Sequence, residues 1–318
     1  MSNPEKNPAE VLCETQPAAG VQLLEPREVP LGGPRAMNVR RTLPQRSRSL
    51  IGGWCFVDHY GPDTTRMLVP PHPHTGLQTV SWLFAGDIEH RDSVGSLAAV
   101  RPGELNLMTA GSGISHSEIS PASPTLLHGA QLWVALPDAH RHTAPSFESV
   151  VPTPFDLQGA TVSVFIGELA GVASPATVFS PLLGAQLDIP AGTTVTLPVN
   201  STFEHGVLVD AGAVTVANVA TPPDHLAYLA PGATELVITA STDARLLLLG
   251  GEPLGESIVM WWNFIGRSHD EIVEFRAQWQ ADVINGGNPD GRFGTVAGCD
   301  EAPLPAPELP TVRLKPRE

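Results

Sequence analysis

The sequence predicts an all-β protein of the sandwich or barrel type, divided into two β units. Short apolar runs recur at intervals of about 8–12 residues with turn-forming residues between them, which is typical of such folds. Leu105–Met108, Thr161–Ile166 and Arg245–Leu249 are examples. The 30 glycines and 32 prolines favour tight turns and short strands over long helices. A chain of 318 residues has room for two domains of roughly 100–200 residues each.

The ends of the chain and the connection between the units are predicted from composition. Residues 1–20 are polar and contain proline, and we expect them to be disordered. A polar, proline-rich connection near residues 137–154 separates an N-terminal domain, 21–143, from a C-terminal domain, 144–295. The last residues, 296–318, form a proline-rich tail that we expect to lack any packed element.

One segment, residues 269–283, is predicted to be helical. It follows an S-x-x-E capping box made by Ser268 and Glu271. Apolar residues at spacings of three, four and four then form a single stripe: Ile272, Phe275, Trp279 and Val283. The glycines and proline of NGGNPDG end the segment. We expect this helix to pack across the open side of a barrel.

Charge and cysteine content narrow the class of protein. With 33 acidic and 18 basic residues, the formal charge of −15 argues against nucleic acid or an anionic membrane as the main partner. The three cysteines, Cys13, Cys55 and Cys299, form no CxxC pair and no disulfide framework. The N-terminus has no apolar signal segment, and no apolar run approaches the ~18 residues of a membrane span. We therefore expect a cytoplasmic protein.

The sharpest chemical motif is a pair of short histidine-containing segments. His72 and His74 are followed 42 residues later by His116, with Glu118 two residues beyond. An i, i+2 spacing on an extended chain places both side chains on the same face. Two such strands, paired inside a small barrel, would aim four ligands at one point. Three imidazoles and a carboxylate suit Fe(II), Mn(II), Cu(II) or Zn(II).

Other histidines are weaker candidates. A single H-x-H pair is more often structural than functional, and His140 and His142 have that spacing in the connection without a partner pair. His205 and His225 in the second half form neither H-x-H nor H-x-E. We interpret these two as structural or surface residues, and the second β unit as one that serves packing or recognition.

The surroundings of the first motif resemble the pirin family, a branch of the cupin superfamily. The resemblance covers residues 35–295 and is most specific over 71–118. It is carried by GGWCFVDHYGP (52–62), PHPHTG (71–76), HRDS (90–93), MTAGSGISHSE (108–118), GGEPLGESIVMWWNF (250–264) and GRFG (291–294).

The resemblance implies two cupin (jelly-roll) β-barrel domains with a C-terminal helix, and one metal in the N-terminal barrel. By motif position its ligands are His72, His74, His116 and Glu118. Family members bind iron, so Fe(II) is the first expectation, with Mn, Cu, Zn or Ni as alternatives. Several are described as quercetin 2,3-dioxygenases, and others as regulatory proteins. The resemblance therefore implies oxidative cleavage of a flavonol by O2 with loss of CO. The alternative is a non-catalytic, redox-sensitive iron protein that acts through protein partners; a cupin sugar isomerase fits the motifs less well.

Five residues near the motif need separate interpretation. Glu118 is the candidate base that would deprotonate the flavonol 3-hydroxyl. His90 and Asp92 would either orient a ligand imidazole or line the pocket mouth, or else lie on a solvated loop, and we favour the solvated loop. Gln78 stands where the family more often has glutamate, and Leu107 where it often has tryptophan. We expect both to lie beside the site, where they would alter its charge and shape.

Overall fold

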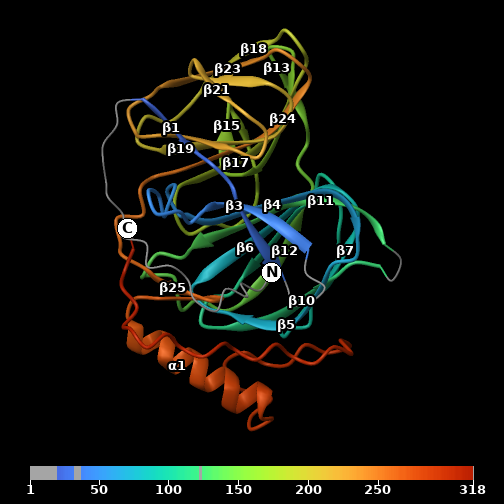
Figure 1. Ribbon diagram of the computed structural model, residues 1–318, viewed down its shortest axis with the longest axis vertical. Coiled ribbons are helices and arrows are strands. Elements are labelled where there is room, and N and C mark those ends of the chain that lie inside the picture. The colour runs from blue at the N-terminus through green and yellow to red at the C-terminus, as the bar shows by residue number, and fades with distance from the viewer. Residues whose placement is uncertain (1–19, 32–36, 122–123, 318) are drawn as a thin grey trace.

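The computed structural model describes residues 20–31, 37–121 and 124–317, so the predicted disorder of residues 1–19 lies outside the described part. Two β domains are stacked one above the other, and a single α-helix among these residues, α1 (His269–Trp279), lies at the far end of the N-terminal domain (Figure 1). The prediction of an all-β protein with a C-terminal helix is confirmed. No helix in the described segments has the length and apolar character needed to cross a bilayer.

The N-terminal domain consists of two antiparallel sheets. Its larger sheet contains β2 (Arg27–Leu31), β3 (Met37–Leu43), β4 (Trp54–Thr65), β6 (Leu77–Ala85), β9 (Leu105–Thr109), β11 (Thr125–Ala135) and β12 (Ser146–Val150). The smaller sheet contains β5 (Leu68–His74), β7 (Ile88–Asp92), β8 (Leu97–Val100) and β10 (Ile114–Ile119). The strand orders are β12-β9-β6-β11-β4-β3-β2 and β5-β10-β7-β8.

The C-terminal domain repeats this plan. Its larger sheet contains β1 (Val21–Leu24), β13 (Phe155–Leu157), β14 (Ala160–Ile166), β17 (Leu182–Ile189), β19 (Glu204–Ala211), β22 (Leu226–Leu229) and β24 (Ala244–Gly251). The smaller sheet contains β18 (Thr194–Pro198), β20 (Val214–Val216), β21 (Val219–Thr221) and β23 (Glu235–Ala240). The orders are β1-β22-β19-β24-β17-β14-β13 and β18-β23-β20-β21, and β15 (Glu168–Leu169) pairs with β16 (Val172–Ala173) as a small hairpin.

Two strands pair in a different domain from the one to which the sequence assigns them. The observed domains therefore differ from the predicted division between residues 143 and 144. The strand β1, assigned by sequence to the first domain, pairs with β22 in the second. Conversely, β12 lies beyond the predicted boundary but pairs with β9 in the first domain. Each of these two strands pairs with backbone N–H and C=O groups at the edge of a sheet. A domain boundary placed from composition alone does not detect such pairing.

The helix begins where the capping box predicts. The Ser268 side chain accepts a hydrogen bond from the backbone N–H of Glu271 at 3.2 Å. Ile272, Phe275 and Trp279 are buried, and the last predicted turn is a π-helical segment, η1 (Gln280–Ile284).

The helix packs with the hairpin of β25 (Val259–Trp261) and β26 (Phe264–Gly266). This hairpin contacts the first domain through a bridge between Phe264 and Thr75. The helix predicted as part of the C-terminal domain, 144–295, therefore packs at the N-terminal one.

The proline-rich tail is packed, contrary to the expectation for residues 296–318. Ala306 is buried and Leu304 is half-buried in the cluster around the helix. The backbone N–H of Leu304 donates to the carbonyl of Pro71 at 2.8 Å, and the Trp279 indole donates to the carbonyl of Leu304 at 2.8 Å. Its prolines exclude helix over most of its length, but intervening apolar residues still bury their side chains in the cluster around the helix.

One of the buried apolar clusters is shared by the two domains. Trp54, Trp82 and Leu107 of the first domain belong to the same buried cluster as Phe165 and Leu247 of the second. The Trp82 and Phe165 rings stack at a centroid distance of 4.6 Å. Because this contact is buried and apolar, the first barrel is held against the second by the hydrophobic effect.

Candidate metal centre

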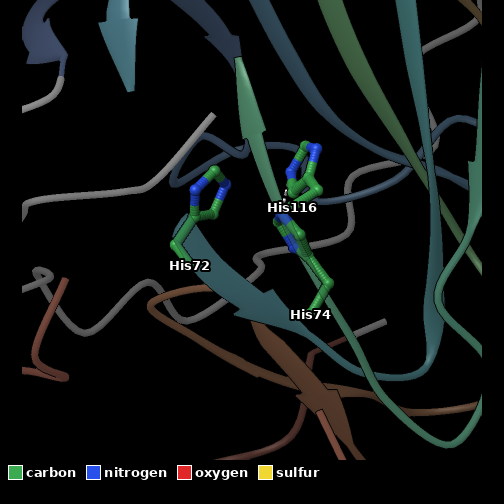
Figure 2. A group of neighbouring side chains, drawn as sticks. All are labelled: His72, His74 and His116. Carbon is green, nitrogen blue, oxygen red and sulfur yellow. Dashed lines mark hydrogen bonds between the residues drawn. The ribbon is translucent and has the colours of Figure 1, made fainter. Parts of the chain in front are cut away.

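Two paired strands of the smaller N-terminal sheet carry the predicted histidines. Strand β5 ends with His72 and His74, and β10 runs antiparallel beside it with His116 directly opposite His72. The alternation of side chains along a strand turns all three imidazoles to the same face. Figure 2 shows the rings of His72, His74 and His116 gathered around one point.

The distances between these rings suit a common metal ion. The Nε2 atoms of His74 and His116 are 3.1 Å apart, and one nitrogen from each of the three rings lies within 4.8 Å of the others. Metal–nitrogen bonds of ~2.0–2.1 Å place neighbouring ligand atoms about 2.8–3.4 Å apart in octahedral or tetrahedral geometry. All three side chains are fully buried, so water does not surround the nitrogens.

Hydrogen bonds to the opposite ring nitrogens fix the direction of two imidazoles. His72 Nδ1 lies 2.9 Å from the carbonyl of Pro70, and His74 Nδ1 lies 3.2 Å from the carbonyl of Asn263. Since a carbonyl only accepts, the proton of each neutral ring is on Nδ1 and the Nε2 lone pair is free to coordinate. The Nε2 atom of His72 is buried without a hydrogen-bond partner among the described residues, which a metal ion would supply.

Burial also keeps these imidazoles neutral. Loss of solvation lowers the pKa of His72 to about 3, and it lowers the pKa of His74 and His116 well below the ordinary histidine value. A neutral imidazole is the form that binds a metal. The residues present therefore fit a divalent transition metal.

The carboxylate of Glu118 lies beside this triad. It forms its own close group with His90 and His116, with ligand atoms within 4.8 Å of one another. The pairing of β10 with β5 shifts register between His116 and Glu118, and Glu118 is not grouped with His72 and His74. The structure thus brings three of the four predicted ligands to one point and places the fourth next to His116.

Two residues near Glu118 were not identified from the sequence: Ser81, which contacts it, and Gln131, which contacts Ser81. Ser81 Oγ lies 3.0 Å from Glu118 Oε1 and 2.8 Å from Gln131 Oε1, and all three side chains are buried. Ser81 is on β6 and Gln131 on β11, opposite each other. The sequence signal that could have identified Ser81 and Gln131 is a polar residue within an otherwise apolar strand. A buried hydroxyl or amide needs a hydrogen-bond partner, so such a residue indicates a nearby polar group.

His90 and Asp92 lie on β7 and are buried, so the slightly favoured solvated loop is wrong. His90 Nε2 is 3.2 Å from Asp92 Oδ2, and its Nδ1 is 3.4 Å from His116 Nδ1. Asp92 Oδ1 in turn accepts the backbone N–H groups of Val94 and Ser96 at 3.0 and 2.8 Å. Burial alone would raise the pKa of Asp92, but the hydrogen bonds from His90 and Ser96 lower it overall. A carboxylate held in this way orients His90, and His90 orients the third imidazole, His116.

Gln78 and Leu107 face away from the histidines. Strand alternation turns Ser81 into the N-terminal barrel and Gln78 out of it. The Gln78 amide donates to Thr109 Oγ1 at 2.9 Å and to the carbonyl of Thr177 at 3.0 Å. Leu107 belongs to the core shared by the two domains. The expectation that these residues lie beside the site is therefore corrected: both belong to the contact with the second domain.

The remaining predicted histidines lie apart from the centre. His205 is buried, and burial lowers its pKa to about 4, while His225 Nδ1 is 2.9 Å from the carbonyl of Pro223. His140 and His142 are exposed. In the described part of the C-terminal domain, no three histidine, cysteine or acidic side chains from that domain alone form a close group.

Two antiparallel β domains of one plan, with a histidine cluster inside the first, define a bicupin protein. Comparison with protein families agrees with this class. The sequence model of the pirin family matches residues 36–134, and that of the pirin C-terminal cupin domain matches residues 184–285. The chain belongs to the pirin family.

Individual relatives extend over most of the chain. A Pseudomonas aeruginosa protein with a provisional quercetin 2,3-dioxygenase name is 40% identical over 295 residues, covering 91% of each chain. A pirin-like protein of Caulobacter vibrioides is 38% identical, covering 76% of this chain and 88% of that one. The crystal structure of a quercetin 2,3-dioxygenase from Acinetobacter baumannii matches with a TM-score of 0.86 and 38% identity, covering 93% of this chain and 98% of that one.

Proposed function

We propose that this protein is a metal-dependent dioxygenase that cleaves the ring of a flavonol or related polyphenol with O2. The observation that carries the proposal is the convergence of three buried, neutral imidazoles, one of which has an unpartnered Nε2 atom. The quercetin 2,3-dioxygenase names of the Pseudomonas and Acinetobacter relatives support the substrate class.

His72, His74 and His116 would hold the metal through their Nε2 atoms, and Glu118 would complete the set of four. Fe(II) is the proposed ion, because nitrogen and carboxylate ligands suit it; Mn, Cu, Zn and Ni accept the same ligands. When bound, iron would supply Lewis acidity toward the flavonol oxygens and a redox centre for O2. The Pro70 and Asn263 carbonyls and the His90–Asp92 pair would keep the three rings in place.

Glu118 is the proposed proton acceptor for the flavonol 3-hydroxyl. Its Oε1 is within hydrogen-bond distance of Ser81 Oγ, so the serine can hold the carboxylate in one orientation. The Gln131 amide beside the same hydroxyl limits the positions that Ser81 can adopt. Because the side chains are buried, the proton would pass to the carboxylate and not to bulk water.

The proposal is tested with protein loaded with Fe(II) under anaerobic conditions and then mixed with quercetin in air. We expect loss of the flavonol absorbance in the wild-type protein and none in His74→Ala, with His142→Gln, an exposed substitution, as the matched control. Metal-loaded wild-type protein that leaves quercetin intact would refute the enzymatic proposal. That result would instead favour the non-catalytic, redox-sensitive protein acting through partner proteins.

A further inference from the structure

A second polar cluster, which the proposed function does not use, lies where the two domains meet. The first domain contributes His59 on β4 and His128 on β11. The second contributes Asp210 on β19, Asp224 before β22 and Arg245 on β24. His59, His128 and Asp210 are all buried, with relative exposures of 1%, 7% and 7%. We call these five residues the interdomain cluster.

Both ring nitrogens of His59 face carboxylates of the second domain. Its Nε2 is 2.6 Å from Asp210 Oδ1, and its Nδ1 is 2.9 Å from Asp224 Oδ1. A neutral imidazole carries one N–H and would direct the lone pair of its other nitrogen at a carboxylate oxygen. Only the imidazolium form donates to both aspartates.

Arg245 contacts both Asp210 and the other histidine, His128. Its Nε donates to Asp210 Oδ2 at 2.7 Å, and its terminal nitrogen lies 3.4 Å from His128 Nδ1. Because a guanidinium only donates, a hydrogen bond across this contact needs His128 Nδ1 as the acceptor, with a ring proton on Nε2. That Nε2–H points at Asp210 Oδ1, 2.5 Å away.

Arg40 of β3 is the other cation beside His59. Its Nε pairs with Asp224 Oδ1 at 3.0 Å, and its terminal nitrogen is 3.4 Å from His59 Nδ1. The shorter distance from His59 Nδ1 to the aspartate, 2.9 Å, favours a hydrogen bond to Asp224 over one from Arg40. Phe84 of β6 packs edge-on against His59 and adds no charge.

Hydrogen bonds explain this cluster better than a metal ion does. The two Nε2–Oδ1 distances are 2.6 and 2.5 Å, shorter than the 3.1 Å between His74 and His116 in the metal centre. Ligands around one metal ion are about 2.8–3.4 Å apart, so a metal would force this group open. Arg245 also balances the Asp210 carboxylate, which leaves less attraction for a cation.

We propose that the interdomain cluster is a proton-dependent lock, in which the imidazolium of His59 on the first domain ties Asp210 and Asp224 of the second. Loss of that proton breaks one of the two hydrogen bonds and removes the charge that both aspartates face. The lock is separate from the metal centre and holds whether or not the protein turns over a flavonol.

Solvation and charge agree with this geometry. Burial by itself would lower the pKa of His59, and Arg40 acts in the same direction, but the bonds to Asp210 and Asp224 raise it overall. A pKa that is higher in the folded than in the unfolded state stabilises the fold fully at pH values below the unfolded one, ~6.5. This contribution is lost as the pH rises through the folded-state pKa of His59.

The test compares wild-type protein with His59→Gln in urea unfolding between pH 5.5 and 9.5. We expect wild type to lose its advantage over the variant as pH rises, by up to about tenfold in the unfolding equilibrium constant per pH unit. The exposed control His142→Gln should follow the wild-type curve. Parallel curves for wild type and His59→Gln would overturn the proposal.

Two measurements on folded protein keep the proposal testable if His59→Gln does not fold. A pH titration of the ring 15N shifts of His59 in wild-type protein should place its protonation midpoint above the ordinary histidine value of ~6.5, and a midpoint at or below that value would overturn the lock. The zinc content of zinc-saturated wild type and His128→Gln should be equal, because His128 belongs to the only grouping in the cluster, His59, His128 and Asp210, that could hold a metal among the described residues. One equivalent fewer in His128→Gln would mean that the cluster binds metal instead.

Discussion

Replacement of Glu118 by glutamine separates its proposed role as ligand from its proposed role as base. The amide oxygen of glutamine can still accept the hydrogen bond from Ser81, now 3.0 Å from Glu118 Oε1, so the side chain should keep its orientation. The substitution removes one negative charge, which raises the net charge of a divalent centre from +1 to +2. We expect metal affinity to fall about 10–100-fold, as for other perturbed metal surroundings. Loss of proton abstraction should slow turnover by a further ~10²–10⁴-fold.

The assay uses Glu118→Gln protein with saturating Fe(II), so that weaker metal binding does not limit the rate. Flavonol binding, measured anaerobically, should persist while turnover in air is lost, and Glu118→Ala should lose both metal and activity. Glu104→Gln is the matched control, because it makes the same chemical change in the same domain outside the histidine cluster. Near-normal turnover of iron-saturated Glu118→Gln would refute the base role and leave Glu118 as a ligand at most.

Three further predictions concern the centre and the fold. His72→Ala should abolish stoichiometric metal binding, whereas His205→Ala should retain it by elemental analysis; equal losses would contradict a single site in the first domain. Asp92→Asn should weaken metal binding about 10–100-fold, measured by competition with a chelator, and unchanged affinity would mean that the aspartate orients nothing. Arg41 donates to Asp58 through two nitrogens at 2.7 and 2.8 Å with both side chains buried, so Arg41→Met should lower the free energy of unfolding by about 3–5 kcal/mol. Replacing both Arg41 and Asp58 by apolar residues should recover much of the lost free energy of unfolding, measured by urea denaturation. If none is recovered, the unpaired Asp58 carboxylate is not the cause of the loss in Arg41→Met.

The sequence by itself determined the elements whose signals are local. The recurrence of short apolar runs between turns predicted the all-β fold, and the capping box placed the start of the helix at Ser268. The i, i+2 spacing of His72 and His74 sufficed to predict that both face the same side, because the side-chain period of a strand is two. The hypothesis that this strand pairs with the one carrying His116 agrees with the observed register.

Tertiary structure decided what depends on partners distant in the chain. Nothing local indicates that β1 pairs in the second domain, or that the carbonyl of Asn263 orients the ring of His74 across 189 residues. The direction of Gln78 depends on the register of β6, since a shift of one residue would turn it into the barrel. The interdomain cluster joins His59 to Asp210 across 151 residues, and only the packing of two finished domains brings these side chains together. Such contacts form because folding buries apolar surface over the whole chain, whereas sequence patterns report only on neighbouring residues.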